Sequence, residues 1–97
     1  MSRNLIVDIL SDNTLCVRFP GRTWELMHDV VEELRDEPPE GYRMVESQVK
    51  PRAPHKSGRR CNVRLVFMNI DDRIPMNTVD ALLFFKPYML RAQGVEP

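Results

Sequence analysis

Two short runs of apolar residues near the N-terminus are separated by a polar turn. Leu5 to Leu10 is mainly β-branched and aliphatic, and Thr14 to Phe19 alternates between apolar and polar positions. Between them, the side chains of Ser11-Asp12-Asn13 can bond their own backbone, and Asn and Asp tolerate left-handed conformations. Two such runs around a tight polar turn predict a β-hairpin, and Pro20-Gly21 should end its second strand.

After Gly21, the spacing of the apolar residues changes from the two-residue alternation of a strand to the spacing of a helix. Apolar residues recur at i, i+3, i+4 and i+7, the spacing of one helical face: Met27, Val30, Val31 and Leu34. Thr23 is a suitable N-cap for this helix, and Pro38-Pro39 should end it.

The second half of the chain repeats this succession of strands and helix. Tyr42 to Val49 predicts a third strand, and Cys61 to Ile70 gives the strongest strand pattern in the chain. Lys50 to Arg60, rich in Pro, Lys and Arg, is expected to be the loop that joins them. The last segment, from about Asn77 to Gln93, has helical spacing, and Pro87 should kink or split this helix.

The expected order is therefore ββαββα in a single domain, residues 1–97. Helices that follow hairpins favour the α+β class, with a four-stranded, mainly antiparallel sheet and both helices on one face. The composition, 42% hydrophobic and 29% charged, is that of an ordinary globular protein. Cys16 and Cys61 are expected to be buried thiols in a cytoplasmic protein, and no segment approaches the ~20 apolar residues that would span a membrane.

The formal net charge is zero, but it hides a polarity along the chain. The segment from Trp24 to Gly41 contains seven acidic residues and one basic residue, a net charge of −6. The segment from Tyr42 to Arg64 contains seven basic residues and one acidic residue, a net charge of +6. Local patches of charge, more than net charge, steer partners toward a protein. The sequence therefore directs attention to two surfaces of opposite sign.

Catalytic and metal-binding patterns are not found. Two Cys and two His residues are present, but none lies at a spacing typical of a zinc site. A Cys–His catalytic pair is the alternative, yet Cys16 and Cys61 fall inside predicted strands, where inert core thiols are expected. We therefore predict no enzymatic activity, no metal and no cofactor.

The two charged surfaces supply the candidate binding residues. The acidic candidates occupy the outer face of the first helix: Glu25, Asp29, Glu32, Glu33 and Asp36. The basic candidates cluster in and beside the predicted loop and would attract a phosphate backbone or an acidic protein: Lys50, Arg52, Lys56, Arg59, Arg60 and Arg64. An ordinary amphipathic helix and a solvated loop are the alternatives.

Aromatic residues crowd the last helix. Phe84, Phe85 and Tyr88 cannot all face one core, so some are candidates for contact with a partner or with a second copy in a homodimer. The alternative is that a kinked helix packs on both sides.

In general type (short, compact, charge-polarised and without motifs), the chain is similar to small inhibitors that phages and other mobile elements use against host defence complexes, anti-CRISPR proteins among them. That resemblance implies a protein or ribonucleoprotein complex as the partner. We therefore predict a non-enzymatic interaction protein that binds a macromolecular partner through charged surfaces. The alternative is a nucleic-acid-binding module that uses the basic loop, residues 50–64.

Overall fold

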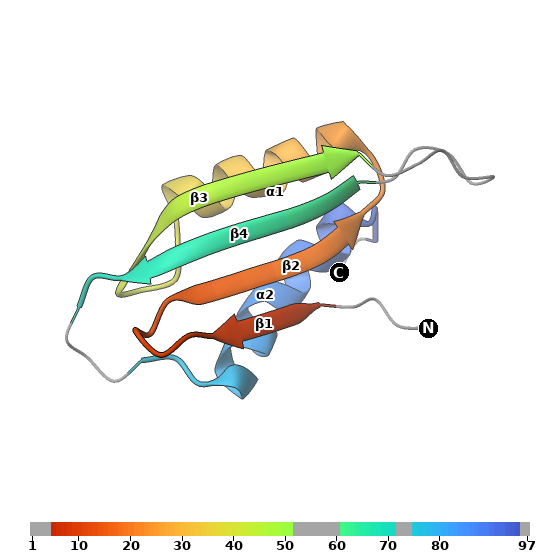
Figure 1. The fold of residues 1–97 in the computed structure, drawn as a ribbon. Coiled ribbons are helices and arrows are strands. Elements are labelled where there is room, and N and C mark those ends of the chain that lie inside the picture. Colours follow the sequence, from red (N-terminus) through yellow and green to blue (C-terminus); the bar gives the residue numbers. More distant parts are fainter. Residues whose placement is uncertain (1–4, 52–60, 72–74, 96–97) are drawn as a thin grey trace.

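The computed structural model describes residues 5–51, 61–71 and 75–95, which form a four-stranded antiparallel sheet and two helices (Figure 1). The elements are β1 (Ile6–Ile9), β2 (Leu15–Gly21), α1 (Trp24–Asp36), β3 (Tyr42–Pro51), β4 (Cys61–Asn69) and α2 (Thr78–Ala92). The predicted α+β class and the order ββαββα are confirmed. The strands lie in the order β1-β2-β4-β3, and both helices cover the same face. We call the other face, which no described element covers, the open face.

The N-terminal hairpin forms as the sequence predicts. β1 and β2 pair antiparallel, with Val7 opposite Val17. In the turn, Asn13 takes a left-handed conformation with φ of 65°, and the Asp12 carboxylate accepts a hydrogen bond from the Thr14 N–H at 3.2 Å. Hydrogen bonds from Thr14 also lower the pKa of the Asp12 carboxyl. The polar turn therefore sets the register of the hairpin through local bonds.

β2 continues two residues further than the sequence predicts. Pro20 and Gly21 pair with Asn62 and Cys61 of β4 instead of ending the strand. Proline is tolerated here because pairing with β1 ends at Arg18, so this part of β2 lies at an edge. The Pro20 carbonyl accepts a hydrogen bond from the Gln93 side chain at 3.2 Å, which ties the end of β2 to the last turn of α2.

Local cap chemistry sets the start of each helix. The Thr23 hydroxyl accepts a hydrogen bond from the Leu26 N–H at 3.2 Å, and the Asn77 side chain accepts one from the Asp80 N–H at 2.8 Å. α2 is not split at Pro87 but runs unbroken to Ala92, and a kink at this residue stays a prediction. Pro87 cannot donate to the Leu83 carbonyl, but both residues are exposed, where water can replace the lost bond.

The core lies between the two helices and one face of the sheet. Its large, fully buried side chains include Phe67 of β4 and Phe85 of α2, whose ring centroids are 5.5 Å apart. Cys16 and Cys61 are both buried free thiols, as predicted. They point to opposite faces, because Cys61 belongs to the core and Cys16 lies opposite Val66 on the open face.

β3 forms one edge of the sheet and also runs longer than predicted. Lys50 and Pro51 extend the ladder by pairing with Asn62 and Cys61. A β-bulge interrupts the register between Met44 and Glu46, which leaves Val45 exposed. Beyond the bulge, Glu46, Gln48 and Lys50 point to the open face, because they lie opposite Val66, Arg64 and Asn62.

Candidate functional site

The outer face of α1 carries most of the predicted acidic residues at the surface. Glu25, Asp29, Glu32 and Asp36 are exposed. Glu33 is different, because it is half-buried and accepts a hydrogen bond from Arg91 of α2 at 2.8 Å. The four exposed carboxylates can therefore meet a partner, whereas Glu33 joins the two helices. We call these four residues the acidic surface.

Glu33, Arg91 and Tyr88 form a small polar cluster between the helices. The bond from Arg91 lowers the pKa of the Glu33 carboxyl, and the same bond raises the pKa of Arg91. The Arg91 guanidinium lies 5.6 Å from the centre of the Tyr88 ring, and burial raises the pKa of Tyr88. This cluster fixes the helix that carries the acidic surface against α2.

A tryptophan that we did not predict as a site residue stands beside the acidic surface. Trp24, the first residue of α1, is 54% exposed, and its ring stacks on that of His28 with centroids 4.8 Å apart. His28 Nδ1 is 3.5 Å from a carboxylate oxygen of Glu32. Trp24 is the only tryptophan in the chain and precedes Met27 by three residues, so helical spacing alone assigns it to the core. Its position at the helix start leaves it exposed.

The aromatic residues of α2 mostly face the core. Phe85 is fully buried and is therefore not available to a partner, because the sheet and helices enclose it. Phe84 and Tyr88 are half-buried and pack against the core; the Phe84 ring meets that of Phe85 edge-on, with centroids 4.9 Å apart. The most exposed apolar side chains of α2 are instead Val79 and Leu83. A homodimer through this helix stays a prediction.

Two of the six predicted basic residues lie within the described part of the chain. Lys50 ends β3 and Arg64 lies in β4, and both point to the open face. The other four, Arg52, Lys56, Arg59 and Arg60, fall outside the described residues. The sheet adds a residue that our prediction lacked, because Arg18 of β2 lies directly opposite Arg64. The alternation of β2 places Arg18 on this face, but only the pairing of β2 with β4 brings the two arginines together.

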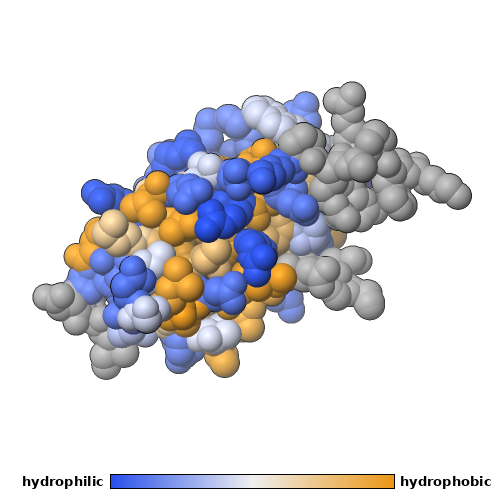
Figure 2. Space-filling view, viewed as in Figure 1, coloured by the Kyte–Doolittle hydropathy of each residue, from blue (hydrophilic) through white to orange (hydrophobic). Residues whose placement is uncertain are grey.

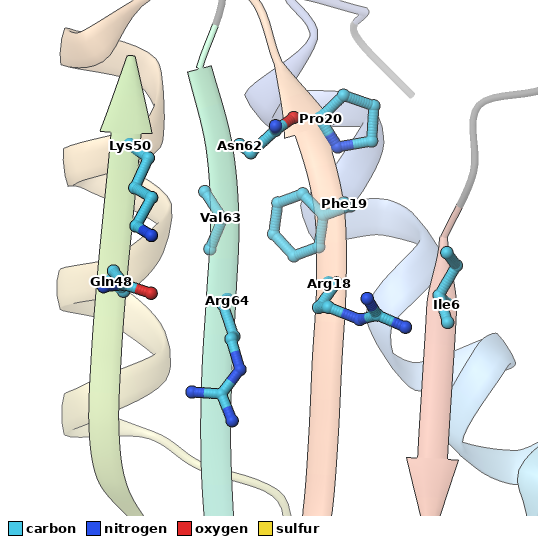
Figure 3. Close-up of a pocket in the computed structure, with 9 residues that line it drawn as sticks. All are labelled: Ile6, Arg18, Phe19, Pro20, Gln48, Lys50, Asn62, Val63 and Arg64. Carbon is cyan, nitrogen blue, oxygen red and sulfur yellow. The ribbon is translucent and has the colours of Figure 1, made fainter. Parts of the chain in front are cut away.

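These basic side chains line a shallow depression of about 410 Å³ on the open face, whose apolar lining residues are Ile6, Phe19, Pro20 and Val63 (Figure 3). Arg18, Arg64 and Lys50 contribute from three adjacent strands, and the amide side chains of Gln48 and Asn62 lie among them. Figure 2 shows this face, where hydrophilic and apolar side chains alternate over the strands. We call this site the basic depression.

No catalytic pair is formed by the described cysteines and histidine. His28 is exposed on α1, whereas both thiols are buried in strands. Over residues 5–51, 61–71 and 75–95, no group of three or more His, Cys, Asp or Glu side chains is placed to hold a metal ion. Neither α1 nor α2 is long and apolar enough to cross a membrane.

Comparison with protein-family models, with curated proteins and with solved structures finds no match to this chain. Its function must therefore be inferred from its own surfaces.

Proposed function

We propose that this protein is a non-enzymatic interaction protein that binds a protein or ribonucleoprotein partner through the acidic surface of α1. The observation that carries the proposal is the exposure of Trp24 next to the carboxylates of that helix. A large apolar ring with about half of its surface in water is an unused source of binding energy.

Trp24 and the acidic surface together match a basic partner. Tryptophan is among the residues that most often dominate binding energy at protein interfaces. Its ring face also attracts Lys and Arg side chains, while Glu25, Asp29 and Glu32 favour a positive surface around it. The expected partner therefore presents an apolar or cationic pocket inside a ring of Lys and Arg.

The helix is held firmly enough to serve as a ready-made binding element. Thr23 caps its first turn, Arg91 bonds Glu33, and Arg35 donates a hydrogen bond to the Ser47 hydroxyl of β3 at 2.9 Å. Fixing a binding element before the encounter reduces the entropy that is lost on association.

An inhibitor of a host defence complex is one form of this function. An acidic helix of this kind would occupy a basic groove that otherwise holds a nucleic-acid backbone. That assignment is supported by the charge of α1 and by the general type of the chain.

The sole tryptophan makes the proposal directly testable. Because Trp24 is the only tryptophan, its fluorescence reports on this surface alone. Titration with an Arg-rich peptide should shift its emission to shorter wavelength as the ring leaves water. An unchanged spectrum in the presence of the peptide, at low salt, would argue against this surface.

Capture of the natural partner gives the second test. The tagged chain should retain a protein from a lysate of the source organism, both with and without nuclease treatment. Trp24→Ala and the reversal Asp29→Lys/Glu32→Lys should each abolish capture. Leu83→Ala is the matched control, since it truncates an exposed apolar residue of the other helix. Equal loss with Leu83→Ala, or capture of nucleic acid with no protein bound to it, would overturn the proposal.

A further inference from the structure

We infer that the basic depression is a second binding site, independent of the acidic surface, and that it takes the phosphate backbone of duplex nucleic acid. The depression is made by residues that are distant in sequence and brought together by strand pairing. Arg18 lies opposite Arg64, and Arg64 lies opposite Gln48. In the next row, Asn62 lies between Pro20 and Lys50.

The described strands give the open face an excess of positive charge. Four cations project from it, Arg18, Arg43, Lys50 and Arg64, against two carboxylates, Asp8 and Glu46. The acidic surface of α1 belongs to the side of the sheet that the helices cover. An approaching polyanion is therefore attracted to one side of the molecule and repelled from the other.

Asp8 and Glu46 each bind one arginine but occupy only some of the N–H donors of its guanidinium group. Asp8 accepts from Arg18 Nη2 at 3.2 Å, and Glu46 accepts from Arg64 Nη1 at 3.0 Å. A guanidinium has five N–H donors, so most of them stay available. The two bonds pull the arginines toward opposite edges of the sheet, since β1 and β3 carry the two acids. The space between the arginines is thus kept open for an anion.

Lys50 adds a cation that no carboxylate of the described residues neutralises. Over the described residues no ion pair involves Lys50, which is exposed. The side-chain amides of Gln48 and Asn62 supply further N–H donors beside it. Ammonium, guanidinium and amide groups are the hydrogen-bond donors that proteins use to bind phosphate oxygens.

The lack of exposed aromatic side chains on the described strands of this face favours duplex over single-stranded nucleic acid as the ligand. The described strand residues that project from the open face include no aromatic side chain, and Phe19, which lines the depression from below, is only 2% exposed and cannot stack on a base. Sites for single-stranded nucleic acid use aromatic rings to stack bases, and protein interfaces use them as anchors. Backbone phosphates of a duplex need neither. The expected binding is therefore independent of base sequence and strongly dependent on salt.

A fluorescent DNA duplex of about 20 base pairs is the probe, and anisotropy at several salt concentrations is the measurement. Each phosphate contact contributes a slope of about −0.9 to the plot of log K against log salt. Three contacts predict a slope near −3 and a loss of affinity of roughly 40-fold between about 50 and 200 mM salt. The triple variant Arg18→Gln/Lys50→Gln/Arg64→Gln should remove most of this slope.

Two further variants distinguish loss of the binding site from a change in net charge and from damage to the fold. Arg35→Gln removes a cation from α1, on the covered side of the sheet, and should leave duplex binding nearly unchanged. Glu46→Gln releases Arg64 from its counter-ion and should strengthen binding several-fold. A gain of affinity cannot come from unfolding, so this variant keeps the test valid if the triple variant is unstable.

Three outcomes would overturn the inference. They are no binding of the duplex at low salt, equal binding by the triple variant with its fold intact, and displacement of the duplex by poly-glutamate at equal charge concentration. The last outcome would assign the depression to an acidic protein. None of these results bears on Trp24, so the inference and the proposed function can fail separately.

Discussion

Gly21 at the end of β2 lies directly against the side chain of Met27 in α1, and a Cβ at position 21 would overlap the Met27 sulfur. Both residues are buried, and Met27 is fully enclosed in the core. The close approach lets α1 begin immediately beneath the end of the strand. Glycine is needed here for space.

Gly21→Ala should lower the free energy of unfolding by about 1–3 kcal/mol, because an overpacked core shifts its side chains or backbone. Met27→Ala alone should also be destabilising, by about 2–5 kcal/mol, through the cavity it leaves. The double variant should cost less than the sum of the two, since the smaller side chain makes room for the new methyl group. Urea unfolding of the four proteins measures the coupling, and strictly additive effects would contradict the contact.

The Glu33–Arg91 bond between the helices should make stability depend on acid pH. The folded-state pKa of Glu33 lies below its ordinary value of 4.5, so the unfolded chain binds the proton more readily. The stabilisation is therefore complete above about pH 4.5 and is lost as the pH falls through the lowered folded-state value. Melting temperatures of the wild type and Glu33→Gln should converge in acid.

The matched control for this pH effect is Asp36→Asn, which removes an exposed carboxylate of the same helix and leaves the bond to Arg91 intact. Its melting temperature should follow that of the wild type across the same pH range. A constant difference between the wild type and Glu33→Gln at every pH would show that the bond is not the cause.

Truncation of Phe85 in α2 should destabilise the protein far more than truncation of Leu83 in the same helix. Phe85 is fully buried against Phe67, and Phe85→Ala should cost about 3–5 kcal/mol through lost burial and a cavity. Leu83 is 67% exposed, and Leu83→Ala should change stability by no more than about 0.5 kcal/mol. Chemical denaturation of both variants checks the placement of α2, and similar losses would mean that the helix is rotated.

Arg18 and Arg64 face each other across β2 and β4, an arrangement that is unfavourable unless nearby acids compensate it. Asp8→Asn/Glu46→Gln should therefore lower stability, by no more than about 1 kcal/mol because both ion pairs are exposed. The loss should shrink when salt screens the two arginines. A loss that does not change between low and high salt would exclude charge repulsion as its origin.

The helix starts and the acidic face of α1 could be predicted correctly because they depend on local chemistry. Thr23 and Asn77 mark the helix starts because capping needs only a side-chain oxygen and the next backbone N–H groups. Likewise, the acidic positions of α1 follow from the spacing of Met27 and Leu34 on the opposite face. Each of these features depends on residues within one or two turns.

The basic depression could not be predicted in the same way. It depends on β2 pairing with β4, and nothing near Arg18 in the sequence indicates that Arg64 will be its neighbour. Similarly, Pro20-Gly21 is a local signal for a chain stop, but pairing with β4 and the bond from Gln93 override it. The exposure of Trp24 could not be predicted because helical spacing gives the direction of a side chain around the helix axis and not its burial at the first residue of the helix.

The bulge in β3 has a consequence for how the protein behaves in a crowded solution. β3 is a long edge strand, and such edges are templates on which strands of other molecules add and aggregate. The irregular register between Met44 and Glu46 interrupts that template, and the charged residues Arg43 and Lys50 lie on either side of it. At the other edge, β1 is only four residues long. The sheet thus discourages edge-to-edge polymerisation, although no described helix or strand covers its open face.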